Sequence, residues 1–393
     1  MNWKRIALGI LILSLAAGVW GFLMLLNNGQ QMLGLGSFVV WGLWMALYVF
    51  FASTAAGMFF IASLDLLFKV KTFAGTGKIF MLASLASLGA GLIHILINEG
   101  RPERVMNVFL HPNFDSVLAW SVWIYTLIAL ATAAILLVLF IPQKRLPFRK
   151  EPVIKWLMIL GFPVAVIASG AVGFTLSTQS SHSFWSVGLF PVLFPIFGMS
   201  AGFALSRIIV ALYGDKTSPG YPRLAKTMAI STIALLLSIT YIIGSVLFVG
   251  IYDATPPTIE AANYIMFGQY WYGFWIVQIG LGIVVALGAL IKVLSKPGLS
   301  KKPAWGLTIG VLVLLGAAVA RLNFIIPAQI VAGADFLSSP IIDSRYIDSY
   351  IPTLPEWALS AGITAAVILA FYIIAKMMKL IPVRIGNEET GDE

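Results

Sequence analysis

The stretch from Val117 to Ile141 reads VLAWSVWIYTLIALATAAILLVLFI and contains no Asp, Glu, Lys or Arg. An α-helix needs about 20 apolar residues to cross the ~30 Å hydrocarbon core of a bilayer. Only helices and closed β-barrels satisfy all of their backbone hydrogen bonds in lipid. A barrel strand shows about ten residues of alternating hydrophobicity rather than a continuous apolar run. The stretch therefore predicts a transmembrane α-helix.

The same pattern recurs along the sequence, which predicts an all-α integral membrane protein with ten transmembrane helices. The predicted spans are residues 6–26, 38–68, 79–97, 117–141, 153–176, 188–213, 228–251, 270–293, 305–326 and 357–380. Hydrophobic residues make up 60% of the sequence and charged residues 10%, whereas soluble domains contain about 25% charged residues. The first span resembles a secretory signal, but it is longer than a typical signal core, so we expect it to be retained. We treat residues 1–393 as a single polytopic membrane domain in contact with the lipid bilayer.

Basic residues gather in alternate connectors, which predicts the orientation of the protein. All but four of the 25 Lys and Arg residues lie on one side, and the exceptions are Arg101, Arg104, Arg321 and Arg345. By the positive-inside rule the basic side is cytoplasmic. An even number of spans then places both termini in the cytoplasm, and we expect the protein in the cytoplasmic (inner) membrane. The net charge of +9 thus reflects topology, and no nucleic-acid partner is expected.

Two pairs of segments suggest an internal repeat. FFASTAAG at 50–57 resembles FGMSAG at 197–202, and WSVWIY at 120–125 resembles YGFWIV at 272–277. The pairs predict a first four-helix bundle at 38–176 and a second at 188–326, with the first span and the final helix at 357–380 outside them. Because each bundle has an even number of helices, the duplication would be parallel. The alternative is a chance similarity between apolar helices.

The sequence contains no cysteine and three histidines. Disulfides, thiolate zinc sites and cysteine-ligated iron–sulfur clusters are therefore excluded. Of the histidines, only His94 lies inside a clear span, whereas a bis-histidine haem needs intramembrane pairs. We expect no intrinsic haem, no iron–sulfur cluster and no metal site in this protein.

The richest polar cluster, HILINEGRPERV at 94–105, follows the apolar part of the third span. If that helix runs to Asn98, His94 and Asn98 share one face, because they are four residues apart. Glu99 and Arg101 would then lie at the membrane boundary. Ionisable residues in membranes are candidates for function. The alternative is that His94 only bonds a neighbouring helix and Arg101 only anchors at the interface.

The segment HPNFDSVLAWSVW at 111–123 leads into the fourth span on the same side. We expect its polar and aromatic side chains Asp115, Ser116, Trp120 and Ser121 to face the His94 cluster. Polar groups at one end of an apolar site suit a ligand with carbonyl oxygens and a long apolar tail, which describes a quinone. A histidine or carboxylate near the carbonyl can exchange the proton that accompanies its redox chemistry. We assign proton handling to His94, Glu99 and Arg101.

Other polar residues lie in or beside the spans. We expect Asp65 and Arg207 to form a structural ion pair. The alternative is that they belong, with Ser53 and Ser200, to an inward proton path. Arg321, Asn323 and Gln329 are expected to close the ninth span on the outer side, before a long connector at 331–355 that predicts a folded cap or docking surface. His182 is expected to be a solvated loop histidine.

These segments carry a resemblance to the NrfD/PsrC family of quinone-interacting membrane subunits. The resembling stretches are NEGRPER to HPNFDSVLAWSVWIY (98–125), STQSSHSFWSVGLFPVLFPIFGMSAG (177–202), ARLNFIIPAQ (320–329) and IPTLPEWALSAG (351–362). The ten-helix DsrP-like branch fits best and the HybB-like branch second. One departure concerns the aspartate of the family pattern, whose place is taken here by Asn98, so that Glu99 or His94 would have to substitute.

The resemblance implies a subunit that binds menaquinone or another quinone near the outer face and has no haem, cluster or flavin of its own. It also implies an extracytoplasmic ferredoxin-like iron–sulfur partner subunit, with multihaem cytochrome c and other membrane or catalytic subunits beyond. The residues alone leave two alternatives open, a secondary transporter and a passive membrane anchor. A transporter would place broken helices and polar groups at mid-membrane in both halves.

Overall fold

The computed structural model describes residues 3–36, 39–179, 182, 184–186, 188–252, 256–337 and 350–386. Within these ranges ten helices are long and apolar enough to cross a membrane, which confirms the predicted number of spans. The described residues form no β-strand, and one isolated bridge joins Gly214 to Val383. The all-α membrane fold is therefore confirmed.

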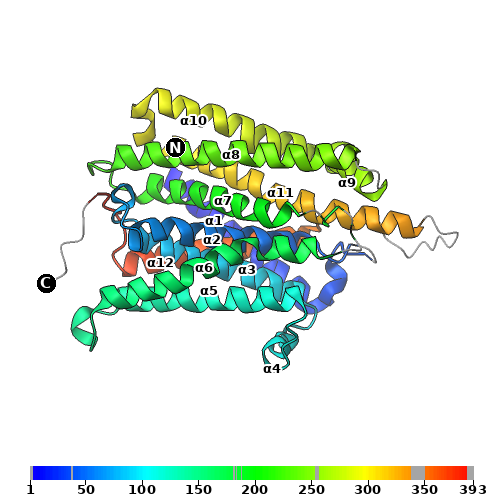
Figure 1. The fold of residues 1–393 in the computed structure, drawn as a ribbon, viewed down its shortest axis with the longest axis horizontal. Helices are drawn as coiled ribbons and strands as arrows, with labels where there is room; N and C mark the ends of the chain where they lie inside the picture. Colours follow the sequence, from blue (N-terminus) through cyan, green and yellow to red (C-terminus); the bar gives the residue numbers. More distant parts are fainter. Residues whose placement is uncertain are drawn as a thin grey trace.

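The long helices run roughly parallel to one another (Figure 1). They are α1 (Trp3–Asn28), α2 (Leu43–Leu66), α3 (Gly77–Asn98), α5 (Val117–Phe140), α6 (Lys150–Ser177), α7 (Phe190–Tyr213), α8 (Tyr221–Tyr252), the π-helix η5 (Gly273–Val285) continued by α10 (Ala286–Ser295), α11 (Pro303–Leu337) and α12 (Leu354–Met377). The short ones are η1 (Gly29–Met32), η2 (Lys71–Phe73), η3 (Pro102–Met106), α4 (Asn107–Leu110), η4 (Gln143–Arg145), α9 (Pro256–Phe267) and η6 (Pro297–Lys301).

Three helix boundaries differ from the prediction by more than three residues. The second span was expected from residue 38 and the seventh from residue 228, but α2 begins at Leu43 and α8 at Tyr221. The ninth was expected to end at 326, but α11 continues through Pro327 to Leu337. A proline is tolerated inside a membrane helix because neighbouring groups satisfy the freed backbone atoms. The predicted span stopped one residue before Pro327, whereas the helix continues through it.

The centre of the fold is the crossing of α2 and α7. A Cβ on Gly202 of α7 would lie 2.7 Å from the carbonyl carbon of Gly57 on α2, and one on Gly198 would lie 2.6 Å from the Ser53 carbonyl oxygen. The backbones approach so closely that only small residues fit, as is common in membrane helix pairs. The two segments that suggested the repeat therefore pack against each other.

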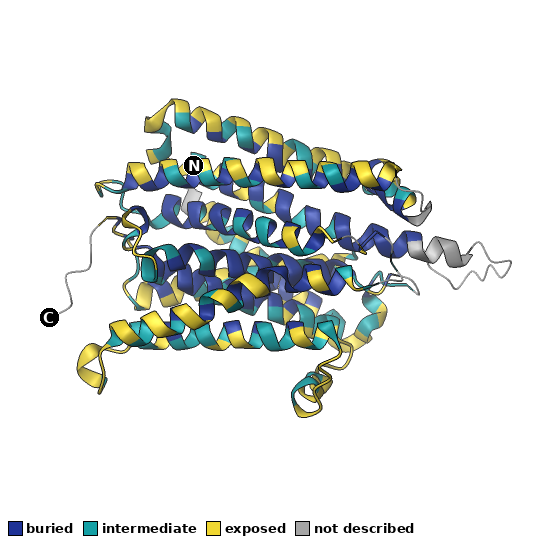
Figure 2. Ribbon diagram, viewed as in Figure 1, coloured by how far each residue is buried: buried dark blue, intermediate teal, exposed yellow. Residues whose placement is uncertain are grey.

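The other helices surround this crossing. α2 packs on α3 and α6, and α5 packs on α6, whereas α7 and η5 pack on α11 and α8 packs on α7. α1 lies along α12, which also contacts α3. Burial is greatest in the middle layer that contains α2 and α7 and falls toward α5, α8 and α10 (Figure 2). The assignment of residues 38–176 and 188–326 to two duplicated bundles stays a prediction.

Different elements lie at the two ends of the bundle. The last turn of α12 lies at the left end in Figure 1, and α4 and α9 lie at the opposite end. We call that opposite end, where α3 ends and α5 begins, the predicted outer face. Its outward orientation stays a prediction from the distribution of basic residues.

Candidate functional site

His94 lies on α3, four residues before the helix ends at Asn98 and so about 6 Å from that end. The side chain is completely buried, and its ring stacks on Phe51 of α2 with 5.4 Å between ring centroids. The imidazole Nδ1 lies 2.7 Å from the Ala90 carbonyl oxygen. Since a carbonyl can only accept, Nδ1 carries the hydrogen and Nε2 of the neutral ring presents a lone pair.

Nε2 of His94 has no hydrogen-bond partner among the described residues. Burying a polar atom without a partner costs free energy, so such atoms are uncommon in native interiors. A basic nitrogen fixed in one tautomer near the predicted outer face is suited to exchange a proton with a bound hydroxyl group.

The rest of the segment 94–105 lies nearer the surface. As predicted, α3 ends at Asn98, and Pro102 begins η3. Asn98 is half-buried, whereas Glu99 and Arg101 are exposed. The structure thus places these three side chains on the predicted outer face and His94 beneath it.

The predicted partners on the fourth span do not converge on His94. Ser116 is the N-cap of α5, where its Oγ accepts a hydrogen bond of 3.4 Å from the Ala119 amide. Asp115 and Trp120 are exposed, and the indole of Trp120 donates to the Phe114 carbonyl oxygen at 2.8 Å.

Ser121 is buried, and its hydroxyl lies 2.9 Å from the hydroxyl of Thr175 on α6. This residue joins α5 to α6, whereas the His94 ring stacks on α2. The eight predicted residues therefore form an outer rim and two separate buried contacts rather than one closed pocket.

The residues of the predicted proton path are also separate. Asp65 accepts a hydrogen bond of 2.7 Å from the Gly77 amide at the start of α3. Arg207 is buried on α7, and its Nε and Nη2 have no hydrogen-bond partner in the described part of the protein. Ser53 and Ser200 are buried farther along α2 and α7.

Arg321 lies at the meeting of α2, α7 and α11 and was missed as an interior residue. It is completely buried, and its Nη2 donates to Ser53 Oγ at 2.9 Å. Its Nη1 donates to the Ala317 carbonyl oxygen at 3.1 Å, and the guanidinium carbon lies 4.3 Å from the ring centroid of Phe197. The continuation of the apolar sequence beyond Pro327 was the signal that Arg321 is not at a helix end.

Gln329 joins α11 to the segment that precedes α2. Its Oε1 accepts from the amides of Val40 and Trp41, each at 3.0 Å. Its Nε2 donates to the carbonyl oxygens of Trp41 and Ile325, each at 2.9 Å. These four bonds use the full capacity of a primary amide.

Glu356, at the start of α12, also joins segments that are distant in sequence. It is 2% exposed, and its oxygens accept from the Gly34 amide at 3.0 Å and from the Tyr350 hydroxyl at 2.6 Å. The Tyr350 hydroxyl in turn accepts from the Leu43 amide at 2.8 Å. We call Gln329, Tyr350 and Glu356 the outer clasp. Of the predicted cap at 331–355, residues 338–349 lie outside the described residues.

His182 is half-buried rather than solvated. Its ring stacks on Trp185 at 4.4 Å, and Trp185 stacks on Trp41 at 5.5 Å. The Trp185 indole donates to the Phe324 carbonyl oxygen of α11 at 2.7 Å. Burial lowers the pKa of His182 from its ordinary value.

The comparisons with known proteins agree with this architecture. The sequence is 29% identical to the C subunit of selenate reductase from Mesobacillus selenatarsenatis, over 95% of this protein and 94% of that one. It is 23% identical to an Hdr-like menaquinol oxidoreductase integral membrane subunit of Archaeoglobus fulgidus, over 96% and 94%. It is 26% identical to the polysulfide reductase C protein of Wolinella succinogenes, over 75% and 96%.

These relatives are membrane subunits of oxidoreductase complexes, and an electron-transfer membrane subunit is the role that they share. The family model described as "Polysulphide reductase, NrfD" matches residues 31–333, which contain α2 to α10 and most of α11. The match covers well over half of the sequence, and the protein therefore belongs to the NrfD polysulphide reductase family of membrane subunits.

Proposed function

We propose that this protein is the quinone-binding membrane subunit of a respiratory electron-transfer complex. It exchanges electrons between a menaquinone-type pool in the bilayer and an extracytoplasmic iron–sulfur subunit. The observation that carries the proposal is the buried, unpartnered Nε2 of His94, whose tautomer is fixed by the bond from Nδ1 to the Ala90 carbonyl oxygen. A residue with only a packing role would not need an unused basic atom there.

The residues around His94 fit a quinone. A quinone supplies two-electron redox chemistry coupled to proton exchange at its ring oxygens. His94 Nε2 accepts a proton from a hydroxyl group or, once protonated, returns it to a carbonyl oxygen. Phe51 gives the imidazole an apolar, flat neighbour, while Asn98, Glu99 and Arg101 supply polar groups at the nearby surface.

The partner surface is proposed on the predicted outer face. The connector between α3 and α5 exposes Met106, Leu110 and Phe114, together with the charged side chains of Arg101 and Asp115. Aromatic residues, Met and Arg are enriched at protein interfaces. We propose that a ferredoxin-like iron–sulfur subunit docks there, with a multihaem cytochrome c or catalytic subunits beyond it.

Proton translocation is a further part of the proposal. The predicted proton path follows α2 and α7 and consists of Asp65, Arg207, Ser53 and Ser200. Arg321 of α11 donates a hydrogen bond to Ser53 Oγ. A proton route through these residues must pass the fixed charge of Arg321. Replacing Arg321 by Gln in membrane vesicles should change the number of protons moved per electron. An unchanged ratio in a fully assembled complex would remove Arg321 and Ser53 from the route.

The site is tested by His94→Gln in the assembled complex. Glutamine keeps a hydrogen-bonding side chain but is not a base at neutral pH, so quinol-linked electron transfer should fall about 100-fold or more. Complex assembly and electron transfer with a soluble donor to the partner subunits should persist. The matched control is His111→Gln, at an exposed histidine of the same connector. Normal quinol-linked turnover in His94→Gln would refute the assignment.

A further inference from the structure

The segment that follows α12 crosses the end of the bundle opposite the predicted outer face. We call residues 381–386 the C-terminal strap. The Val383 amide donates to the Tyr213 carbonyl oxygen at 2.8 Å, and the Asp215 amide donates to the Val383 carbonyl oxygen at 2.9 Å. These two bonds attach the strap to the end of α7.

The rest of the strap lies on the start of α8 and on the connector between α2 and α3. A Cβ on Gly220, just before α8, would lie 3.0 Å from the Ile385 carbonyl oxygen. The Gly386 amide donates to the Ala74 carbonyl oxygen at 3.1 Å. The side chains of Val383 and Ile385 are buried. The strap therefore holds together two connectors that are distant in sequence.

Arg207 lies on the face of α7 that leads to the strap. It precedes the C-cap Gly214, which bridges to Val383, by seven residues, so the two share one face and are about 10 Å apart along the axis. Arg207 is 6% exposed, and its Nε and Nη2 have no hydrogen-bond partner among the described residues. A charge buried in this way gains free energy if water reaches it.

Tyr221, the first residue of α8, contacts the same part of α7. A Cβ on Gly214 would lie 3.3 Å from Tyr221 Cε2, and the phenol is close enough to Arg207 to interact with its charge. The ring is buried, and its hydroxyl donates to the Ser300 carbonyl oxygen at 3.0 Å, which fixes its position. Tyr221 and the strap therefore cover α7 on the side of Arg207.

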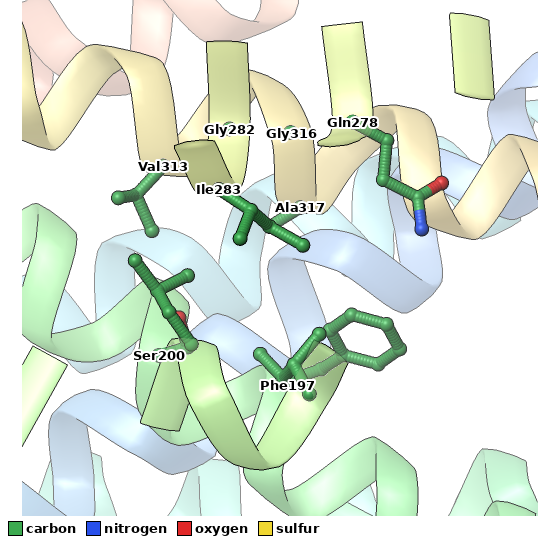
Figure 3. A pocket seen from close by; sticks show the side chains of 10 residues that line it. Phe197, Ser200, Gln278, Gly282, Ile283, Val313, Gly316 and Ala317 are labelled. Carbon is green, nitrogen blue, oxygen red and sulfur yellow. The ribbon is translucent and has the colours of Figure 1, made fainter. Parts of the chain in front are cut away.

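The opposite direction along α7 offers no comparable route for water. Ser200 precedes Arg207 by seven residues, so it lies two turns deeper on the same face. It lines a small cavity of about 20 Å³ between α7, α8, η5 and α11, whose other lining residues are mostly apolar (Figure 3). Apolar cavities stay dry. Water would therefore reach Arg207 from the end that the strap covers.

We propose that the C-terminal strap closes this end of the bundle and keeps the Arg207 guanidinium out of contact with water. When the strap detaches, water reaches Arg207 along the face of α7 that carries Val210 and Gly214. The strap thereby controls hydration at one end of the predicted proton path. Water access can be measured without turnover, so the proposal is tested independently of quinone binding at His94.

The protein contains no cysteine, so a single introduced cysteine is the only thiol in this subunit. Val210→Cys places it one turn from Arg207, at a side chain that is 4% exposed. The purified complex is treated with a water-soluble methanethiosulfonate reagent, and labelling of this subunit is followed by mass spectrometry. The rate should rise about 10-fold or more in a protein that ends at Leu380, and likewise with Ile385→Asp, because buried thiols react only in locally open states.

Two matched controls should keep the slow labelling of Val210→Cys. They are Arg384→Asp, which adds the same side chain at an exposed position of the strap, and a protein that ends at Gly386. A second reporter, Ser200→Cys, should stay unlabelled in every variant, because it lies two turns deeper than Arg207. Slow labelling of Val210→Cys in both strap variants would overturn the proposal. Equal acceleration at Ser200→Cys would also overturn it, since the strap would then stabilise the whole fold instead of covering Arg207.

Discussion

The buried polar groups near the predicted outer face fall into two contrasting sets. In the outer clasp, Gln329 uses all four of its hydrogen bonds and the Glu356 carboxylate accepts hydrogen bonds from three residues. His94, at the same end of the molecule, leaves its basic Nε2 without a partner in the described structure. Both sets are buried, but only in the outer clasp do the polar side-chain atoms have their hydrogen-bond partners.

The difference separates groups that build the fold from groups that are candidates for chemistry. A fully bonded polar network fixes the geometry of the helices that it joins. An unused buried atom lowers stability and is kept only where something else, such as a bound ligand, uses it. Substitutions in the clasp should therefore reduce stability, whereas substitution of His94 should reduce function.

The largest effect is expected for Glu356→Leu. The change removes the acceptor for the Gly34 and Thr353 amides and for the Tyr350 hydroxyl, and leaves buried donors unsatisfied. Loss of such an acceptor should cost about 3–5 kcal/mol. The yield of folded subunit in membranes and the Tm of the purified complex measure it. A variant with wild-type yield and Tm would show that the clasp is not structural.

A smaller but still large effect is expected for Gln329→Glu. The carboxylate can still accept from the Val40 and Trp41 amides, but its second oxygen faces the carbonyl oxygens of Trp41 and Ile325. Two lost bonds and the repulsion between oxygens should cost about 2–3 kcal/mol, seen as a lower Tm. Gln143→Glu, at an exposed connector residue, is the control. An equal fall in Tm for both variants would contradict the role of Gln329.

The comparison becomes sharper with His94→Phe. Phenylalanine keeps a ring against Phe51 and removes the unsatisfied Nε2, although it also loses the bond to Ala90. These opposing changes should leave the free energy of unfolding within about 1 kcal/mol of the wild type. Quinol-linked turnover should nevertheless be lost. A large fall in Tm would place His94 with the clasp and weaken the case for a site.

Much of the fold could be predicted because apolar length and charge placement report directly on membrane spans. The ten spans and the end of α3 close to Asn98 are read from local sequence. The interior position of Arg321 could not be, because a span that ends at a proline and one that continues through it have the same local pattern. The burial of Glu356 could not be either, because it depends on tertiary contacts. Partners such as Ser53 and Gly34 are hundreds of residues away in sequence.

The candidate site residues could be chosen from the sequence, but the arrangement of their side chains could not be predicted. His94 and its neighbours could be chosen because ionisable residues in apolar runs are rare. Sequence spacing does not fix the rotation of α5 about its own axis, so it could not show that Ser121 turns toward Thr175 on α6. Nor could it show that Gln278, in the middle of the π-helix η5, accepts a hydrogen bond from Asn323 of α11.

The smallest effect is expected for the pH dependence contributed by His182, which borders Trp41 through Trp185. Burial lowers the pKa of His182 in the folded protein, whereas the unfolded protein keeps the ordinary value of about 6.5. Below that value the unfolded state binds more protons, so stability falls as the pH drops from about 6.5 toward the folded-state pKa. Above it, the residue contributes no pH dependence.

The loss of Tm between about pH 7.5 and pH 5.5 should therefore be smaller in His182→Asn than in the wild type. Gln143→Asn, at an exposed connector residue that does not titrate, is the control and should keep the wild-type profile. His94 stays in all of these proteins, so its own titration cancels in the comparison. If the Tm of His182→Asn falls as much at acid pH as that of the wild type, the stack on Trp185 does not desolvate the imidazole. His182 then makes no contribution to the pH dependence of stability.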